Sequence, residues 1–245
     1  MGRLFYDNNT KNNIADDFLN DFENSVKTVS DKPPKANYKP SSIACIRAMY
    51  FIMKQMPIDK STFSAEMIGI MESGTDRHKR IQDVLIKNDF VEFINVGEYV
   101  KQNNLDYLIV NSFNEYETHL FDTRYKLSFM TDGVIKYKNK IYILEIKTEA
   151  SNKYFMNSEI PLKHIQQVSC YSLSLGIDDV LFIYENRDIL SKKAYTYKVS
   201  NSDKKAIIKK IENCNKYIEK NIIPPKPIEA TGSFCNYCNY KKYCK

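Results

Sequence analysis

The stretch 130–147 constrains the fold of this chain most strongly, because it has the pattern of a β-hairpin that carries its own set of charges. Residues 133–137 and 141–147 are rich in the β-branched and aromatic side chains that strands prefer. The polar residues 138–140 separate them, and Asn139 accepts the positive φ of a tight turn. The sequence therefore predicts a hairpin that turns at residues 138 and 139.

Asp132 and Glu145 are equally far from this turn, so their carboxylates are expected to lie opposite each other across the strand pair. Strand side chains alternate between faces, so Glu145 and Lys147 share one face and Leu144 and Ile146 the other. Two facing carboxylates repel, and a divalent cation such as Mg²⁺, which takes oxygen ligands, relieves the repulsion. A nearby lysine can stabilise charge on a phosphate. The alternative is a solvated hairpin face with a cross-strand ion pair.

The composition indicates a globular protein with a substantial core. Among 245 residues, 43% are hydrophobic and 13% aromatic, which excludes a disordered chain. The net charge of +6, with both signs interspersed, permits binding to a polyanion. Apolar runs are too short to span a bilayer and the N-terminus lacks a signal-peptide pattern, so we expect an intracellular, cytoplasmic protein. Its six cysteines are then metal ligands or buried thiols rather than disulfides.

Hydrophobic periodicity predicts a mixed set of helices and strands around the hairpin. We expect helices over about 14–26, 43–56, 64–88, 161–175 and 203–222, strands over 91–96, 117–121, 125–129, 180–184 and 195–199, and a loop over 148–159. Ser41 or Ser42 is the expected N-cap of the second helix, which places Cys45 in its first turn. Glu117 is either a third carboxylate of the site or an exposed strand charge.

Three further residues on the predicted helices are candidates for the site. His78 shares a face with Ile81 and Leu85, so it is either a hydrogen-bonded core histidine or a metal ligand. Gln167 and Tyr171 are four residues apart and share one helix face.

The C-terminal tail contains Cys235, Cys238 and Cys244 in the spacing C-x2-C-x5-C. So short a segment has too little core to fold alone, and a metal centre would supply the missing stability. Cys45 is the natural fourth ligand. Zn²⁺ with four thiolates and a [4Fe–4S] cluster both fit this ligand count, and unliganded surface thiols are the remaining alternative.

From about residue 39 to the C-terminus, the chain resembles the RecB-like nucleases of the PD-(D/E)xK superfamily. It is most similar to the CRISPR-associated RecB-type exonuclease family and its phage-borne relatives. The features that carry the resemblance occur in one order: Pro40-Ser41-Ser42 with Cys45 and Arg47, Gly74 with His78, Asp132-Gly133, Glu145-Ile146-Lys147, Gln167 with Tyr171, and the terminal cysteines.

The resemblance implies a restriction-endonuclease-like α/β fold, in which a mixed sheet is flanked by helices and the metal-cluster tail is held against an N-terminal helix. It implies that His78, Asp132 and Glu145, with the Ile146 carbonyl, bind Mg²⁺ or Mn²⁺, and that Lys147 positions the attacking water. Gln167 and Tyr171 would contact the DNA backbone or support Lys147.

By the same resemblance, Cys45, Cys235, Cys238 and Cys244 bind a [4Fe–4S] cluster. Cys170 and Cys214 match no family ligand and are expected to be buried thiols. Two departures concern the substrate: Phe129 stands where relatives often have glycine, and the arm before residue 39 has no clear counterpart.

These observations predict an arm over 1–38, a nuclease core over 39–223 and an iron–sulfur tail over 224–245. The expected activity is metal-dependent hydrolysis of phosphodiester bonds, as an exonuclease on single-stranded DNA ends, in CRISPR adaptation or phage recombination. Expected partners are DNA and either further copies of the chain or CRISPR integration or phage recombination proteins. The alternatives are a non-catalytic DNA-binding assembly subunit with an iron–sulfur or zinc site, and a zinc-stabilised structural protein.

Overall fold

The computed structural model describes residues 14–26, 33–58, 64–88, 90–113, 117–227, 235 and 238–244. Much of the predicted arm, residues 1–13 and 27–32, and much of the predicted tail, residues 228–234, 236–237 and 245, lie outside this described part. Within it, no helix combines the length and apolar character needed to cross a membrane.

Two sheets form the centre of the molecule. The larger has the strand order β1-β5-β6-β7-β8; β6 and β7 are parallel and the other pairs antiparallel. Its strands are β1 (Glu92–Phe93), β5 (Gly133–Tyr137), β6 (Lys140–Glu149), β7 (Asp179–Asn186) and β8 (Lys192–Lys198). The smaller is an antiparallel sheet of β2 (Leu108–Phe113), β3 (Thr118–Asp122) and β4 (Leu127–Thr131). Because β4 leads directly into Asp132 and β5, the smaller sheet feeds the hairpin of the larger one.

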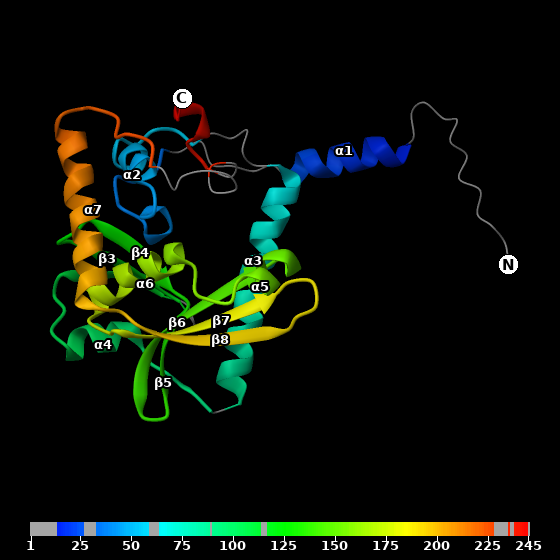
Figure 1. The fold of residues 1–245 in the computed structure, drawn as a ribbon. Coiled ribbons are helices and arrows are strands. Elements are labelled where there is room, and N and C mark those ends of the chain that lie inside the picture. The colour runs from blue at the N-terminus through cyan, green and yellow to red at the C-terminus, as the bar shows by residue number, and fades with distance from the viewer. Residues whose placement is uncertain are drawn as a thin grey trace.

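Helices α3 (Ala65–Lys87) and α6 (Leu162–Leu175) lie against the larger sheet, and Figure 1 shows how the helices are arranged around it. The other helices are α1 (Ile14–Val26), α2 (Ile46–Met53), α4 (Val96–Gln102), α5 (Ser151–Met156) and α7 (Asn201–Glu219), with short 3-10 turns η1 (Pro40–Ser42) and η3 (Lys241–Tyr243). Their ends follow local capping chemistry. The Ser64 side chain accepts a hydrogen bond from the Met67 amide, and Gly176 ends α6 in the left-handed conformation, with φ 73°.

The alternation of side chains along β6 divides the core into two layers. Leu144 and Ile146 pack with Ile81 and Leu85 of α3. Ile143, on the opposite face, belongs to the main core, to which α2, α6 and α7 contribute. The predicted mixed α/β sheet flanked by helices is therefore confirmed, and β6 is its central strand.

A buried carboxylate fixes α3 to the sheet. Glu185 on β7 is fully buried, and it is paired with Arg77 and Arg80 of α3 and with Lys192 of β8. Burial raises the pKa of Glu185, but hydrogen bonds from Arg80 and Lys192 outweigh it and leave that pKa below its usual value. The ionised carboxylate thus stabilises the fold.

Several predicted elements differ from the structure near their ends. The second helix begins at Ile46, and Cys45 is its N-cap rather than a first-turn residue, because residues 40–42 form a separate 3-10 turn. The predicted loop over 148–159 is wrong, since β6 continues to Glu149 by pairing with Asn186 and α5 follows. The predicted strand over 91–96 is shorter because Asn95 caps α4, accepting from the Glu98 amide.

The predicted first helix is confirmed over Ile14–Val26, and none of its residues is buried. It extends away from the sheets and lies beside the end of α3, as Figure 1 shows at the right. Its apolar side chains, including Phe18 at 70% exposed, therefore lie in solvent.

We expect Glu185→Gln to lower the free energy of unfolding at neutral pH by about 1–3 kcal/mol, because Arg77, Arg80 and Lys192 lose the charge of the buried carboxylate that they share. A lowered folded-state pKa stabilises above the ordinary glutamate pKa and ceases to do so as pH falls through the folded value. The difference between variant and wild type should therefore shrink on acidification, as urea unfolding at several pH values would measure.

The matched control is Glu92→Gln, which removes the exposed pair between Glu92 and Lys136 and should change stability by less than about 0.5 kcal/mol. Equal effects of the two substitutions would contradict the structural role of Glu185.

Candidate functional site

The β5–β6 hairpin has the predicted register. Gly133 pairs with Leu144 and Tyr137 with Lys140, so Asp132 follows directly as the residue opposite Glu145. Lys138 and Asn139 form the two-residue turn with φ of 48° and 61°. Two positive φ values give a turn whose twist matches that of the flanking strands, which fixes the register.

Asp132 is held by contacts to β6 and to α3. Its Oδ2 accepts from the Ile146 backbone N–H at 2.6 Å, and its Oδ1 lies 3.1 Å from Nδ1 of His78. Gln82, one helical turn beyond His78, donates from Nε2 to the Asp132 carbonyl at 2.6 Å. Sequence reasoning missed Gln82, although its spacing of four from His78 is the signal that places both on one helix face.

A second network joins β6 to α6 on the other face. Lys147 Nζ donates to Glu145 Oε1 and, at 3.0 Å, to Gln167 Oε1. Gln167 Nε2 is 2.8 Å from Glu145 Oε1 and 2.7 Å from the Tyr171 hydroxyl oxygen. The predicted residues Glu145, Lys147, Gln167 and Tyr171 are thus in direct contact, and the Gln167 amide orients Lys147 beside the carboxylate.

Burial gives the site unusual electrostatics. Burial raises the pKa of Glu145 to about 7; the nearby charge of Asp132 raises it as well, whereas Lys147 opposes the rise. Burial lowers the pKa of His78, but its contact with Asp132 outweighs this and leaves the pKa above the ordinary value. Burial also raises the pKa of Tyr171, so its hydroxyl stays neutral and can accept from Gln167. Two neighbouring carboxylates in a buried setting favour a nearby cation.

The donor chemistry of this site suits a hard divalent cation, with two carboxylates and one imidazole. In the side-chain positions of the described residues, however, no group of three or more His, Cys, Asp or Glu side chains surrounds one point as a metal site would require. Lys147 instead contacts Glu145, and His78 contacts Asp132. A cation held by Asp132 and Glu145 would therefore replace these contacts. Ile146 is fully buried. It contacts Asp132 through its backbone N–H, not through the carbonyl that is predicted to bind the metal.

Glu117, the possible third carboxylate, lies immediately before β3. The β3–β4 register pairs Thr118 with Thr131, so its continuation by one residue places Glu117 opposite Asp132. This position keeps Glu117 a candidate neighbour of the site.

The four cysteines predicted to share a metal lie close enough to affect one another's ionisation. Burial raises the pKa of Cys45, and the charges of Cys244 and Cys235 raise it further, against the lowering effect of backbone N–H groups. Burial likewise raises the pKa of Cys238, Tyr240 N–H lowers it, and the other three thiols add to the rise. Cys45 and the tail cysteines, almost 200 residues apart in sequence, are therefore near each other, but their described side chains do not surround one point as metal ligands would.

The tail is packed onto α2 by aromatic rings and one arginine. The rings of Tyr240 and Tyr243 each lie 5.7 Å from Phe51 between centroids. Arg47 donates to the Pro224 carbonyl at 2.7 Å and, from Nη1, to Cys244 Sγ at 3.5 Å.

The two remaining cysteines, Cys170 and Cys214, are fully buried in the core, as predicted. Both have free thiols.

Comparison with known proteins gives similarity at the level of fold. No family model matches the chain, and no curated protein matches its sequence. The crystal structure of SSO0001 is similar with a TM-score of 0.50 and 14% identity, covering 96% of this chain and 98% of that one. An alkaline exonuclease, LHK-Exo from Laribacter hongkongensis, has a TM-score of 0.44 and 11% identity over 76% of this chain and 89% of its own, and its complex with dAMP scores 0.42 at 10% identity.

The similarity to SSO0001 extends over almost the whole of both chains, so the two proteins share a fold at a sequence identity of only 14%. The mixed sheet and its helices are consistent with the restriction-endonuclease-like arrangement that the sequence predicts.

We expect Gln82→Leu to destabilise the protein by about 1–3 kcal/mol, because the Asp132 carbonyl loses the hydrogen bond that the buried Gln82 side chain donates. Urea unfolding would measure the loss. Asn88→Ala, which removes an exposed hydrogen bond to Val84 at the end of the same helix, is the control and should change stability little. If both variants unfold at the wild-type midpoint, Gln82 does not hold the hairpin to α3.

Proposed function

We propose that this protein is a metal-dependent deoxyribonuclease that hydrolyses phosphodiester bonds. The observation that supports this most is the convergence of Asp132, Glu145 and Lys147 at one end of the hairpin, with Gln167 holding Lys147 in place. A purely structural ion pair would need one carboxylate for one lysine, whereas this site holds a second carboxylate and an imidazole.

Each residue has a role in the proposed reaction. Asp132, Glu145 and His78, with the Ile146 carbonyl, would hold Mg²⁺ or Mn²⁺. When bound, the cation supplies Lewis-acid chemistry, lowering the pKa of water and offsetting negative charge on the phosphate. Lys147 keeps a positive charge beside the reacting phosphate and donates a hydrogen bond to the attacking water.

The contacts of Lys147 suit this role. Its side chain is 20% exposed, so it can reach a substrate while its base stays packed. Gln167 Oε1 fixes the ammonium group, and Tyr171 in turn fixes the Gln167 amide. Because the lysine is positioned in advance, its electrostatic effect requires little reorganisation during the reaction.

The finer assignment is an exonuclease on single-stranded DNA ends, in CRISPR adaptation or phage recombination. It is supported by the order of motifs along the chain rather than by any contact in the site. We therefore propose single-stranded DNA as the first substrate to test, and integration or recombination proteins as the first partners.

We expect Lys147→Ala to abolish cleavage of end-labelled single-stranded DNA, with a loss of at least about 100-fold, while DNA binding falls little. The assay compares Mg²⁺ or Mn²⁺ with EDTA, using anaerobically purified protein. Lys140→Ala is the matched control: it changes a lysine on the same strand that is half exposed and paired with Asp179 at the opposite end of β6. This control should keep wild-type activity.

Unchanged cleavage by Lys147→Ala would contradict the assignment. If the wild type binds DNA and no metal supports cleavage, the non-catalytic assembly subunit becomes the better explanation.

We also propose that Cys45, Cys235, Cys238 and Cys244 hold a [4Fe–4S] cluster, with Zn²⁺ as the alternative. The contact of Cys244 with Arg47 and the packing of Tyr240 and Tyr243 on Phe51 hold the tail next to Cys45 at the start of α2, which supports a shared centre. A [4Fe–4S] cluster and Zn²⁺ both accept four thiolates. The centre would link the tail to the N-cap of α2, adding stability to a segment whose described packing consists mainly of Tyr240 and Tyr243 on Phe51.

We expect anaerobically purified protein to be brown and to contain about four iron and four sulfide ions per chain. Cys244→Ser should lose most of this metal, because one of four thiolate ligands is removed. Cys170→Ala, which changes a buried thiol in the core, should retain it. Colourless protein with one zinc ion per chain would favour the zinc site, and absence of both metals would exclude a metal centre there.

A further inference from the structure

A groove lies beside the candidate site and takes no part in the chemistry described so far. It encloses about 460 Å³. Its walls come from three parts of the chain: the segment that leads into η1, strands β3 and β4, and the face of α6 that carries Gln167 and Tyr171. These parts are distant in sequence, so the groove is a product of the tertiary fold.

The groove reaches the proposed reaction centre through Gln167. Gln167 lines it and contacts both Glu145 and Lys147. On the opposite wall, β4 ends at Thr131, and Asp132 is the next residue. A molecule that lies along β4 in this groove therefore leads toward both carboxylates of the site.

The charge of the groove suits a polyanion. Lys35 and Lys39 line one wall, both exposed, and Ser41 beside them offers a hydroxyl. No acidic residue lines the groove among the described residues. Lysine, serine and asparagine side chains are common donors to backbone phosphates, and Asn37 adds an amide to this wall.

The opposite wall, formed by β3 and β4, offers an imidazole ring and a thioether. His119 and Met130 are paired across β3 and β4, so their side chains share one face of the sheet. His119 Nε2 lies 2.8 Å from Ser128 Oγ, which fixes the imidazole ring. Met130 is 52% exposed. An immobilised ring next to a polarizable thioether gives a base a surface to stack on.

These features favour a single strand over a duplex. A single strand can place a phosphate against the lysines and a base against the opposite wall at the same time. A duplex keeps its bases paired and stacked inside, so it could contact only the outer lysines.

We propose that this groove binds the single-stranded DNA segment next to the scissile phosphate. Lys35 and Lys39 contact its backbone, and His119 with Met130 contacts a base. The proposal rests on the proposed nuclease function for the position of the scissile bond, but the binding that it describes does not require cleavage.

Binding by the full-length protein in EDTA tests the proposal without cleavage. The probe is a fluorescein-labelled single-stranded oligonucleotide, and anisotropy is measured at several salt concentrations. The slope of log affinity against log salt is negative, and each lost phosphate contact on a single strand reduces its magnitude by about 0.7. Lys35→Ala with Lys39→Ala should therefore reduce the magnitude of the slope by about 1.4.

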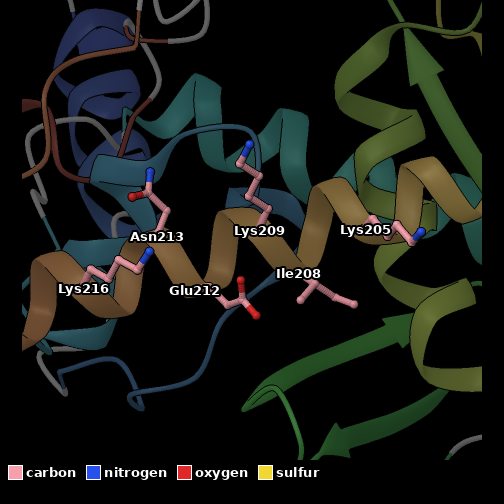
Figure 2. A pocket seen from close by; sticks show the side chains of 6 residues that line it. All are labelled: Lys205, Ile208, Lys209, Glu212, Asn213 and Lys216. Atoms are coloured by element: carbon pink, nitrogen blue, oxygen red, sulfur yellow. The ribbon is translucent and has the colours of Figure 1, made fainter.

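The matched control uses two lysines on the outer face of α7, which Figure 2 shows along one side of that helix. Lys205→Ala with Lys209→Ala removes the same charge from the chain at a place that does not line the groove. The slope should stay at the wild-type value. An equal fall in both double variants would overturn the proposal in favour of general surface attraction.

The contact of a base with the wall formed by β3 and β4 has its own test. Met130→Glu places a negative charge in the groove at an exposed position, so folding should be preserved while affinity falls about fivefold or more. Ile109→Glu is the control, since Ile109 is 47% exposed on β2 of the same sheet. Wild-type affinity in Met130→Glu would contradict contact with a base.

The two proposals fail in different ways. If Lys147→Ala stops cleavage but the groove variants bind like their controls, the nuclease assignment stands and the groove proposal fails. If the groove variants lose binding and no metal supports cleavage, the groove stands and the enzyme assignment fails. Absence of single-strand binding by the wild type, or equal affinity for a blunt duplex, overturns the groove proposal.

Discussion

The register of the β5–β6 hairpin is the constraint on which the rest of the structure depends. A slip of one residue would exchange the faces of β6, moving Glu145 and Lys147 against α3 and exposing Leu144 and Ile146 to the α6 side. The two-residue turn at Lys138 and Asn139 prevents this slip. The parallel pairing of β6 with β7 then fixes the strand inside the sheet, so a polar network can persist at a buried position.

Two helices, α3 on one face of β6 and α6 on the other, hold the residues of the site in place. On the α3 side, apolar packing against Ile146 brings His78 to Asp132, and Glu185 anchors the same helix through its arginine partners. On the α6 side, Gln167 meets Glu145 and Lys147. A change in either helix would therefore reach the carboxylates from a different face, while the covalent hairpin keeps the carboxylates next to each other.

The parts that could be predicted from the sequence are those whose signals are local. The hairpin has β-branched strands and a turn residue at the right spacing, and α3 has a serine cap and one apolar face. Glu185 could not be predicted as an anchor: Lys192 is its neighbour on the adjacent strand, but the partners that fix it to α3, Arg77 and Arg80, are more than 100 residues away in sequence and no local pattern marks them. The groove was missed for the same reason. Its walls are assembled by tertiary packing, whereas the site residues of the motifs lie on single strands and helices.

The cysteine tail and the groove are linked through the start of α2. Cys45 caps that helix, and η1 with Lys39 and Ser41 immediately precedes it, so the thiols and the groove wall are separated by only a few residues of chain. Arg47, in the first turn of α2, holds both the Pro224 carbonyl and the Cys244 thiol. The contacts that hold the tail on α2 therefore lie within a few residues of the basic wall of the groove, so the same short segment of chain supports both.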